Sequence, residues 1–342
     1  MGRGTDSCDL VLGGGGVRGV AHIGALTALE EADYEVVRVA GASAGALAGS
    51  FAVAGVGAGA LKELFDELDT TRFVLADLIG RLRDNRAMSR LLSRFSGDET
   101  DPLTWITEVL EEQGIRTFGD LKVSDVDDDA PIEQRYRLVV RCLDILGRRV
   151  VRLPWDYARF DLDPDAQSVA KAVRASMSIP FVYDPVRIGN RDTGRQALLI
   201  DGGLTSGFPV DVLDRIDGRP PRWPTFGIRL LPRPPATPQL PSSNVELARM
   251  VVDSLLDTSD QLAPASPCDE VRTVRVDLSE VGILDLDADE EYDLFSDGYA
   301  AMRDFLADFS FEDYRARCRP VGSSADGVGD AGAELSGEPS DA

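Results

Sequence analysis

The hydrophobic and polar positions along the chain form short apolar runs that alternate with longer segments of helical spacing. Apolar runs predict strands over residues 9–12, 36–40, 136–142, 149–153, 185–188, 196–200, 225–231 and 271–276. Helical spacing predicts helices over residues 17–31, 166–176, 244–262 and 290–307, and further helices after residue 45 and from near residue 102. Strands that alternate with helices are typical of a mostly parallel sheet covered by helices on both faces.

The domain organisation predicted from this pattern is a single α/β domain over residues 9–310. Residues 1–8 form a short N-terminal segment, and residues 311–342 form a C-terminal extension. From about residue 321 the extension consists of Gly, Ser, Ala and acidic residues without an aromatic side chain. Such a segment buries too little apolar surface to offset its ordering entropy, so we expect it to be disordered.

Residues 72–100 are predicted to be an insertion and a candidate lid. Their large apolar residues have helical spacing, and residues 72–94 contain six arginines and two aspartates, a local charge of +4. A helix with apolar and arginine faces can lie on an anionic bilayer, which predicts peripheral membrane contact through this stretch. The alternative is that these arginines pair with the acidic surface of the same protein.

The overall charge is strongly acidic, with 36 Lys and Arg against 59 Asp and Glu, a net charge of −23. Nucleic acid is therefore excluded as a partner, because phosphate binding depends on Lys and Arg. The acidic residues are 41 Asp and 18 Glu, and only three of the basic residues are Lys. This composition resembles that of halophilic proteins; the alternative is an ordinary acidic enzyme from a GC-rich genome.

Cysteine and histidine are sparse, and we expect no structural zinc site. The cysteines Cys8, Cys142, Cys268 and Cys318 are scattered, and the chain has one histidine. The N-terminal residues contain no apolar signal core, which predicts a cytoplasmic protein with reduced cysteines. Residues 39–61 carry no charge but are mostly Ala and Gly, so we expect a buried helix and not a membrane span.

The first candidate for chemistry is the glycine-rich segment at residues 14–19, between a predicted strand and a predicted helix. Gly14, Gly16 and Gly19 match the spacing of a dinucleotide-binding loop, but no acidic residue ends the second strand to hold a ribose. A Walker-type loop is excluded because Val20 stands where that loop has Lys. The remaining interpretation is an oxyanion hole made of backbone amides.

The second candidate is the Gly-x-Ser-x-Gly element at residues 41–45, centred on Ser43. It lies between a strand and an apolar helix, the context in which it forms a nucleophile elbow. The helix N-terminus would favour a developing oxyanion at this position. The structural alternative is a turn of small residues before a buried helix.

A nucleophilic serine needs a base, and the chain offers two kinds. A Ser-His-Asp triad would have to use His22, one turn into the first helix. A carboxylate can also act directly, and Asp201 is the best placed because it ends a predicted strand. The glycines Gly202 and Gly203 follow it and allow a close approach to the serine.

These three motifs together resemble the patatin-like phospholipase family. Its members carry a glycine-rich oxyanion loop, a Gly-x-Ser-x-Gly serine and an Asp-Gly-Ala/Gly aspartate that form a Ser-Asp dyad. The chain has them in the same order, at residues 14–19, 41–45 and 201–203. The resemblance covers roughly residues 8–310. Two departures are Gly13, where plant patatins carry Asp, and a Gly in the place of Ala at the end of the third motif.

Two further segments, residues 21–26 and 174–180, are similar to family segments. The first places His22 at a structural position of the family. The supporting motif positions are Arg18, Gly19, Gly41, Gly45, Gly202 and Gly203. Arg18 is expected to tie down the glycine-rich loop; the alternative is that it meets an anionic head group.

The resemblance implies a three-layer α/β/α fold with a mostly parallel central sheet. It implies hydrolysis of acyl esters, often phospholipids or lysophospholipids, without a metal or cofactor. Ser43 would be the nucleophile and Asp201 the base, and the amides of Gly14, Gly15 and Gly16 would hold the oxyanion. The alternatives are a non-catalytic lipid-binding protein on the same fold and a nucleotide-binding oxidoreductase.

The charge of −23 generates a prediction about salt. Self-repulsion destabilises the compact state at low ionic strength, and about 1 M salt shortens the screening length to about 3 Å. Thermal unfolding followed by circular dichroism should therefore show a midpoint that rises from about 0.05 M to about 3 M KCl. Full stability and activity in the dilute buffer would contradict this.

Overall fold

The computed structural model describes residues 6–66, 102–124, 126, 130–190, 192–205, 208–233, 240–258, 266–279 and 288–318. Within these residues an eight-stranded sheet has the order β5-β6-β3-β2-β1-β7-β8, with β4 also paired to β3. The strands are β1 (Asp6–Leu12), β2 (Tyr34–Ala42), β3 (Leu138–Asp144), β4 (Arg149–Leu153), β5 (Val186–Asn190), β6 (Arg195–Asp201), β7 (Thr225–Leu231) and β8 (Thr273–Asp277). Each lies where an apolar run predicts a strand.

The sheet is parallel through its centre and antiparallel at one end. Strands β3, β2, β1, β7 and β8 pair in parallel. Strands β4 and β6 pair with β3 antiparallel, and β5 pairs with β6 in the same way. The chain therefore has the predicted α/β architecture with a mostly parallel central sheet.

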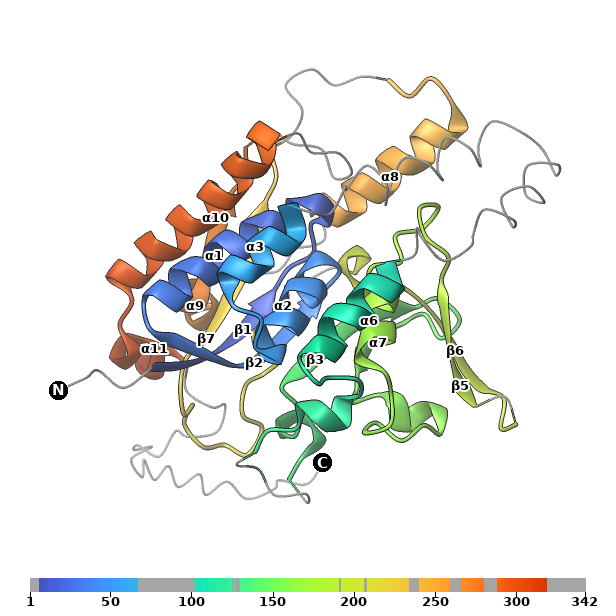
Figure 1. The fold of residues 1–342 in the computed structure, drawn as a ribbon, viewed down its shortest axis with the longest axis horizontal. Coiled ribbons are helices and arrows are strands. Elements are labelled where there is room, and N and C mark those ends of the chain that lie inside the picture. The colour runs from blue at the N-terminus through green and yellow to red at the C-terminus, as the bar shows by residue number, and fades with distance from the viewer. Residues whose placement is uncertain are drawn as a thin grey trace, which may run out of the picture.

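The helices pack on this sheet and on one another. They are α1 (Val20–Glu31), α2 (Ala44–Ala54), α3 (Ala58–Asp66), α6 (Pro102–Glu112), α7 (Val169–Ser176), α8 (Asn244–Thr258), α9 (Pro267–Arg272), α10 (Ala288–Asp308) and α11 (Phe311–Arg317). Short 3-10 helices are η1 (Gly16–Gly19), η2 (Phe118–Leu121), η3 (Ile132–Gln134), η4 (Tyr157–Phe160) and η5 (Gly202–Leu204). In Figure 1, α10, α1, α3, α2 and α6 lie side by side as a layer in front of the sheet.

The uncharged stretch at residues 39–61 contains the end of β2 and the whole of α2. Nearly every residue of α2 is buried, and its glycines bring it close to the sheet: a Cβ on Gly49 would lie 2.4 Å from the side chain of Val39. Among the described residues, no helix is both long and apolar enough to cross a bilayer.

The C-terminal end of the described chain packs against the edge of the sheet. Tyr314 of α11 is 1% exposed, and its hydroxyl accepts a hydrogen bond from the backbone N–H of Thr225 at the start of β7. A disulfide joins Cys268 of α9 to Cys318, directly after α11. The predicted extension thus begins with a packed helix.

This disulfide contradicts the prediction that the cysteines are reduced. Cys268 and Cys318 are separated by 50 residues, so no spacing motif indicates their pairing. Their proximity arises because α9 and α11 contact each other in the fold. The other two cysteines, Cys8 and Cys142, are free and buried.

Several predictions concern segments outside the described residues. These are the candidate lid over residues 72–100 with its basic stretch 72–94, most of the N-terminal segment, and the chain after residue 318.

Candidate active site

The glycine-rich loop follows β1 and turns directly into η1 and α1. Gly16 has φ = 60°, a left-handed conformation that glycine adopts without a steric penalty. His22 of α1 is fully buried, and its Nε2 donates a hydrogen bond of 2.8 Å to the carbonyl of Gly13. Burial lowers the pKa of His22 to about 4, so the ring is neutral at pH 7. The histidine therefore holds the loop, and neither of its ring nitrogens is hydrogen-bonded to Ser43.

Ser43 stands in a strained turn between β2 and α2. Its backbone has φ = 52° and ψ = −125°, a conformation that costs a non-glycine residue of the order of 1–3 kcal/mol. The turn is held by the Ser43 N–H, which donates to Oγ of Ser176 at 2.8 Å, and Ser176 Oγ donates in turn to the carbonyl of Arg141 at 2.7 Å. Helix α2 begins at Ala44, so the hydroxyl lies at a helix N-terminus. This is the geometry of a nucleophile elbow.

Asp201 meets Ser43 across β3. Ser43 Oγ donates a hydrogen bond of 2.7 Å to Oδ2 of Asp201, and the N–H of Gly203 donates one of 2.7 Å to Oδ1. Both residues are buried, with Ser43 3% exposed and Asp201 0% exposed. The structure thus brings the predicted serine and aspartate together.

The pairing register of the strands brings Ser43 and Asp201 together. A position at the end of a strand does not explain this contact by itself. Strand β6 is antiparallel to β3 and pairs with it only through Leu199–Asp201, so β6 enters from beyond the carboxyl end of β3 and its own carboxyl end lies level with that of β2. In β3, Arg141 pairs with Ala42 on β2, and the next residue, Cys142, pairs with Asp201 on β6. Ser43 and Asp201 therefore flank β3 at the same level.

The carboxyl group of Asp201 is less acidic than an ordinary aspartate. Burial raises its pKa to about 7, and the hydrogen bonds from Ser43 and Gly203 oppose that rise. No cation contributes to the shift. A buried carboxyl with a pKa near 7, bonded to a serine hydroxyl, is suited to accept and return a proton near neutral pH.

The predicted oxyanion loop lies against this pair. A Cβ placed on Gly14 would be 3.7 Å from Cβ of Ser43 and 3.4 Å from Cα of Gly203, so the three motifs converge on one point. Among the described residues, no acceptor bonds to the N–H groups of Gly14 and Gly15. Gly16, the third predicted donor, begins η1.

The supporting glycines allow this convergence. Any side chain on Gly45 would meet the loop, since its Cβ would lie 2.5 Å from the carbonyl oxygen of Gly13. A Cβ on Gly202 would lie 2.0 Å from the carbonyl oxygen of Arg141. Gly19 and Gly41 are packed as closely, against Ala44 and Gly45. Each is a position that only glycine fills without a shift of the backbone.

Arg18 connects the loop to α8. Its guanidinium donates to the carboxylate of Asp257 at 2.7 Å, and the Arg18 side chain is 8% exposed. This contact agrees with the expected role of tying down the loop. Sequence reasoning did not find Asp257, and it noted Ser176 only within the family-like segment 174–180, because neither residue stands in a motif that carries chemistry.

A cavity of about 160 Å³ lies beside this site. It is bordered by Gly14, Ala42 and Gly203, is lined largely by apolar side chains such as Val139 and Phe208, and includes neither Ser43 nor Asp201 in its lining. It extends from the oxyanion loop between the sheet and the segment after η5.

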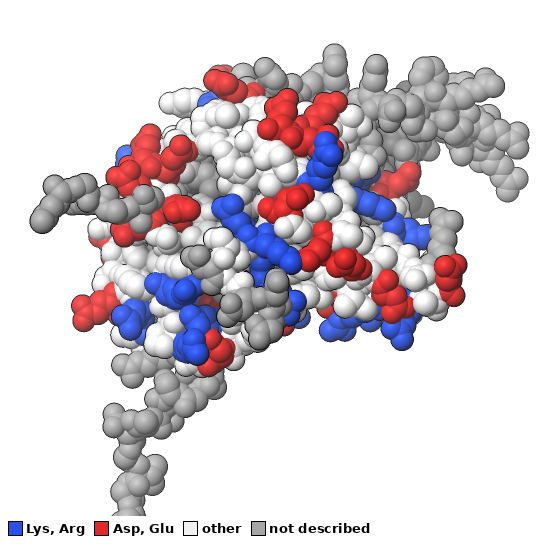
Figure 2. Space-filling view, turned by 60° about the horizontal axis from the view of Figure 1, so that its bottom comes forward, with Lys and Arg blue, Asp and Glu red and all other residues white. Residues whose placement is uncertain are grey.

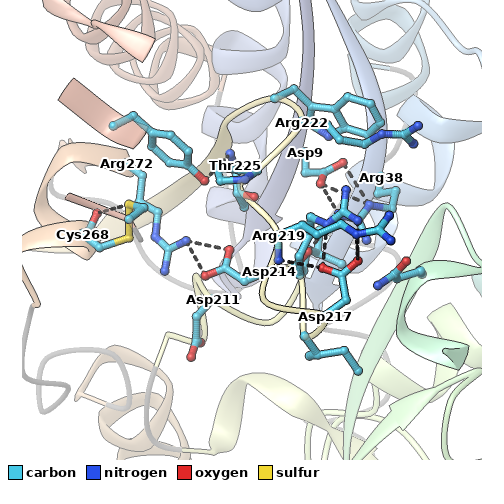
Figure 3. Close-up of a pocket in the computed structure, with 18 of the residues that line it drawn as sticks. Asp9, Arg38, Asp211, Asp214, Asp217, Arg219, Arg222, Thr225, Cys268 and Arg272 are labelled. Carbon is cyan, nitrogen blue, oxygen red and sulfur yellow. Dashed lines mark hydrogen bonds and ion pairs between the residues drawn. A yellow bond between two sulfur atoms is a disulfide. The ribbon is translucent and has the colours of Figure 1, made fainter. Parts of the chain in front are cut away.

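The other cavity, of about 930 Å³, lies at the amino ends of β1 and β7 and contains neither Ser43 nor Asp201 (Figure 3). Its arginines face aspartates: Arg38 pairs with Asp9, Arg272 with Asp214 at 2.8 Å, and Arg215 with Asp217. Figure 2 shows the same mixture of basic and acidic side chains on the surface of this end of the molecule. Each ion pair places a positive charge beside a negative one. The Arg38–Asp9 pair joins β2 to β1, and the Arg272–Asp214 pair joins α9 to the segment before β7.

The comparisons with known proteins concern the family of the chain. The sequence profile of the patatin-like phospholipase family matches residues 10–214, which contain all three motifs. The chain belongs to the patatin-like phospholipase family. As a member of this family it is a lipid ester hydrolase by class.

Several known proteins match the chain over different lengths. The uncharacterized protein YqhO of Bacillus subtilis (strain 168) is 32% identical over 73% of this chain and 79% of that protein. The lysophospholipase NTE1 of Yarrowia lipolytica is 28% identical over 59% of this chain but only 11% of its own length. Among solved structures, VipD from Legionella pneumophila aligns with a TM-score of 0.47 at 18% identity, over 87% of this chain and 66% of that one.

No group of three or more His, Cys, Asp or Glu side chains that could hold a metal ion occurs in the part of the chain that the structure describes. The predicted site residues that the structure brings together are a serine, an aspartate and the glycine-rich loop.

The close packing at Gly202 generates a prediction about stability. Gly202→Ala should lower the free energy of unfolding by about 1–3 kcal/mol, because the new methyl group would displace backbone next to Asp201. Gly59→Ala in α3 is the matched control: nothing lies within 4 Å of its Cβ, and alanine favours the helix by up to about 1 kcal/mol. Urea unfolding in high salt measures both, and equal effects of the two substitutions would contradict the packing argument.

Proposed function

We propose that this patatin-like protein hydrolyses carboxylic esters of lipids through a Ser43–Asp201 dyad and an acyl-enzyme intermediate. The observation that carries the proposal is the hydrogen bond of 2.7 Å from Ser43 Oγ to a fully buried aspartate, in a strained elbow next to a glycine loop. Each part has a separate chemical task.

In the acylation step, Asp201 accepts the proton of Ser43 Oγ while that oxygen attacks the ester carbonyl carbon. The carbonyl oxygen becomes negatively charged, and the amides of Gly14, Gly15 and Gly16 stabilise it together with the N-terminus of α2. When the tetrahedral intermediate collapses, the bond to the alcohol breaks and Asp201 returns the proton to the leaving alkoxide. The acyl group is then bound to Ser43 as an ester.

In the deacylation step, water replaces the alcohol. Asp201 accepts a proton from the water, whose oxygen attacks the acyl carbon, and the same amides hold the second oxyanion. Collapse of this intermediate returns the proton to Ser43 Oγ and releases a fatty acid. The residues assigned to the reaction supply every proton transfer, and the proposal involves no cofactor.

The proposed substrates are phospholipids, lysophospholipids and related acyl esters. The family assignment and the name of the lysophospholipase relative support this class. The apolar cavity bordered by Gly14, Gly203 and Ala42, the residue directly before Ser43, offers space for part of an acyl chain. We further propose a cytoplasmic protein of a halophile that contacts membranes peripherally, with residues 72–94 as one candidate contact.

The competing proposal is a lipid-binding protein without catalysis on the same fold. It would not need the strained conformation of Ser43 or a carboxyl group bonded to its hydroxyl, both of which cost stability. A nucleotide-binding oxidoreductase is disfavoured because the glycine loop faces Ser43, at the place where an acidic residue would hold the ribose.

Hydrolysis of a short p-nitrophenyl acyl ester in about 3 M KCl tests the dyad. Ser43→Ala and Asp201→Asn should each lower kcat by about 10³-fold or more, because each removes a group that takes part in the reaction.

Matched controls are Ser50→Ala, a buried serine of the same helix bonded to the carbonyl of Leu47, and Asp144→Asn, a fully buried aspartate at the end of β3. Both should retain activity within about threefold, since neither touches the dyad. An inert wild-type protein, or a Ser43→Ala variant with the full rate, would support the lipid-binding alternative.

The pKa of Asp201 predicts the pH dependence. Only the ionised carboxylate accepts the serine proton, so kcat/KM should fall about tenfold per pH unit below about pH 7 and level off above it. The only histidine cannot produce this inflection, because burial lowers the pKa of His22 to about 4. Initial rates between about pH 5 and pH 9 measure the profile, and a midpoint near that of an exposed carboxyl would refute the assignment.

A further inference from the structure

Helix α8 has apolar side chains on two opposite sides. On one side, Val252 and Leu256 pack with Ile179, Val182, Tyr183 and Leu204 in a small hydrophobic cluster. This side lies against the site, because a Cβ on Gly203 would be 3.1 Å from Cδ2 of Leu256. The Arg18–Asp257 ion pair joins the same helix to the oxyanion loop.

The other side of α8 is an exposed apolar stripe, formed by Leu247, Met250, Val251 and Leu255. These side chains are 48%, 38%, 50% and 48% exposed. Their spacing places them on one face of the helix, opposite Val252 and Leu256. Four large apolar side chains on one helix face are unusual on a protein surface, where isolated ones need no explanation.

A second exposed apolar group lies next to α8. Phe181 is 66% exposed and has φ = 70°, in the turn whose residues Ile179 and Val182 pack against Val252. A positive φ on a bulky aromatic residue is strained. The same turn continues from Ser178, whose carbonyl accepts the N–H of Asp201. The turn of Phe181 therefore follows a residue that contacts Asp201, and the helix that carries the stripe contacts Gly203, two residues after Asp201.

The electrostatics of this surface favour a neutral partner. The four residues of the stripe are uncharged; the charged residues of α8 whose side chains the structure describes are Asp253 and Asp257, and Asp257 is paired with Arg18. The chain as a whole carries −23, which repels an anionic surface at low salt. In Figure 1, α8 extends away from the helix layer, so its outer face is not part of the packing between α1, α2 and α10.

We propose that the α8 stripe, together with Phe181, is a docking surface for a neutral phospholipid bilayer, into which these apolar side chains insert. The proposal rests on the proposed lipid hydrolysis, because it explains how an ester in a bilayer reaches a buried serine: the elements that touch the bilayer also contact Gly203 and Asp201. Binding by apolar insertion does not require basic residues, and it persists when salt screens the charges.

The test is flotation with phosphatidylcholine vesicles in about 2 M KCl, using the full chain with Ser43→Ala so that no lipid is consumed. The Val251→Asn/Leu255→Asn variant should lose about tenfold or more of its vesicle partitioning, since two apolar side chains no longer enter the bilayer. The matched control is Leu146→Asn/Ile216→Asn, two side chains that are 59% and 63% exposed on other parts of the surface, and it should float like the parent.

Activity separates this proposal from the proposed function. With Ser43 intact, the α8 variant should hydrolyse the short soluble ester within about twofold of wild type and phosphatidylcholine vesicles about tenfold more slowly. A variant that loses vesicle hydrolysis but still hydrolyses the soluble ester supports the docking surface. If the wild-type protein hydrolyses neither substrate but its flotation still depends on α8, the proposed hydrolysis is wrong and the docking surface is supported.

Three results would overturn the docking surface. The first is equal flotation of the α8 variant and its parent. The second is flotation that requires anionic lipid and disappears in molar KCl, which would indicate binding through basic residues. The third is a dimer in light scattering that the α8 substitutions dissociate, which would show that a second copy of the chain covers the stripe.

Discussion

The arrangement of the site depends on one hydrogen bond, between Ser43 and Asp201, which are 158 residues apart. It forms because β3 lies between β2 and β6, with registers that bring both residues to the same level. The glycine loop after β1 then packs on this pair from a neighbouring strand. Three turns can approach this closely only where side chains are absent, so the positions that face one another are glycines.

Burial gives this hydrogen bond its chemical character. The structure contains other buried aspartates, and Asp9 shows the usual solution, an ion pair with Arg38. No cation contributes to the pKa of Asp201, and its hydrogen-bond partners are the hydroxyl of Ser43 and the backbone amide of Gly203. A carboxyl group in this environment holds its proton until near pH 7, whereas His22, buried nearby, loses its proton. The same desolvation thus leaves a carboxyl group, and not the histidine, with a pKa near neutrality.

The surface divides into two regions of different chemistry. At the amino ends of β1 and β7, arginines and aspartates line a broad cavity and form ion pairs such as Arg38–Asp9 and Arg272–Asp214 (Figure 3). Beside the dyad, α8 and the turn at Phe181 expose apolar side chains. In a chain of −23, exposed apolar side chains on α8 and at Phe181 are suited to a neutral lipid surface.

The sequence by itself determined the strand and helix order, the three glycine-containing motifs and the family, because apolar periodicity and motif spacing are local properties. It pointed to Asp201 as the end of a strand, which Asp201 is, but only the register of the antiparallel strand β6 with β3 brings that end level with Ser43. It also missed the Cys268–Cys318 disulfide and the Arg18–Asp257 pair. Only the tertiary structure decided these contacts and the pKa of Asp201, because they depend on distances and burial between segments far apart in the chain.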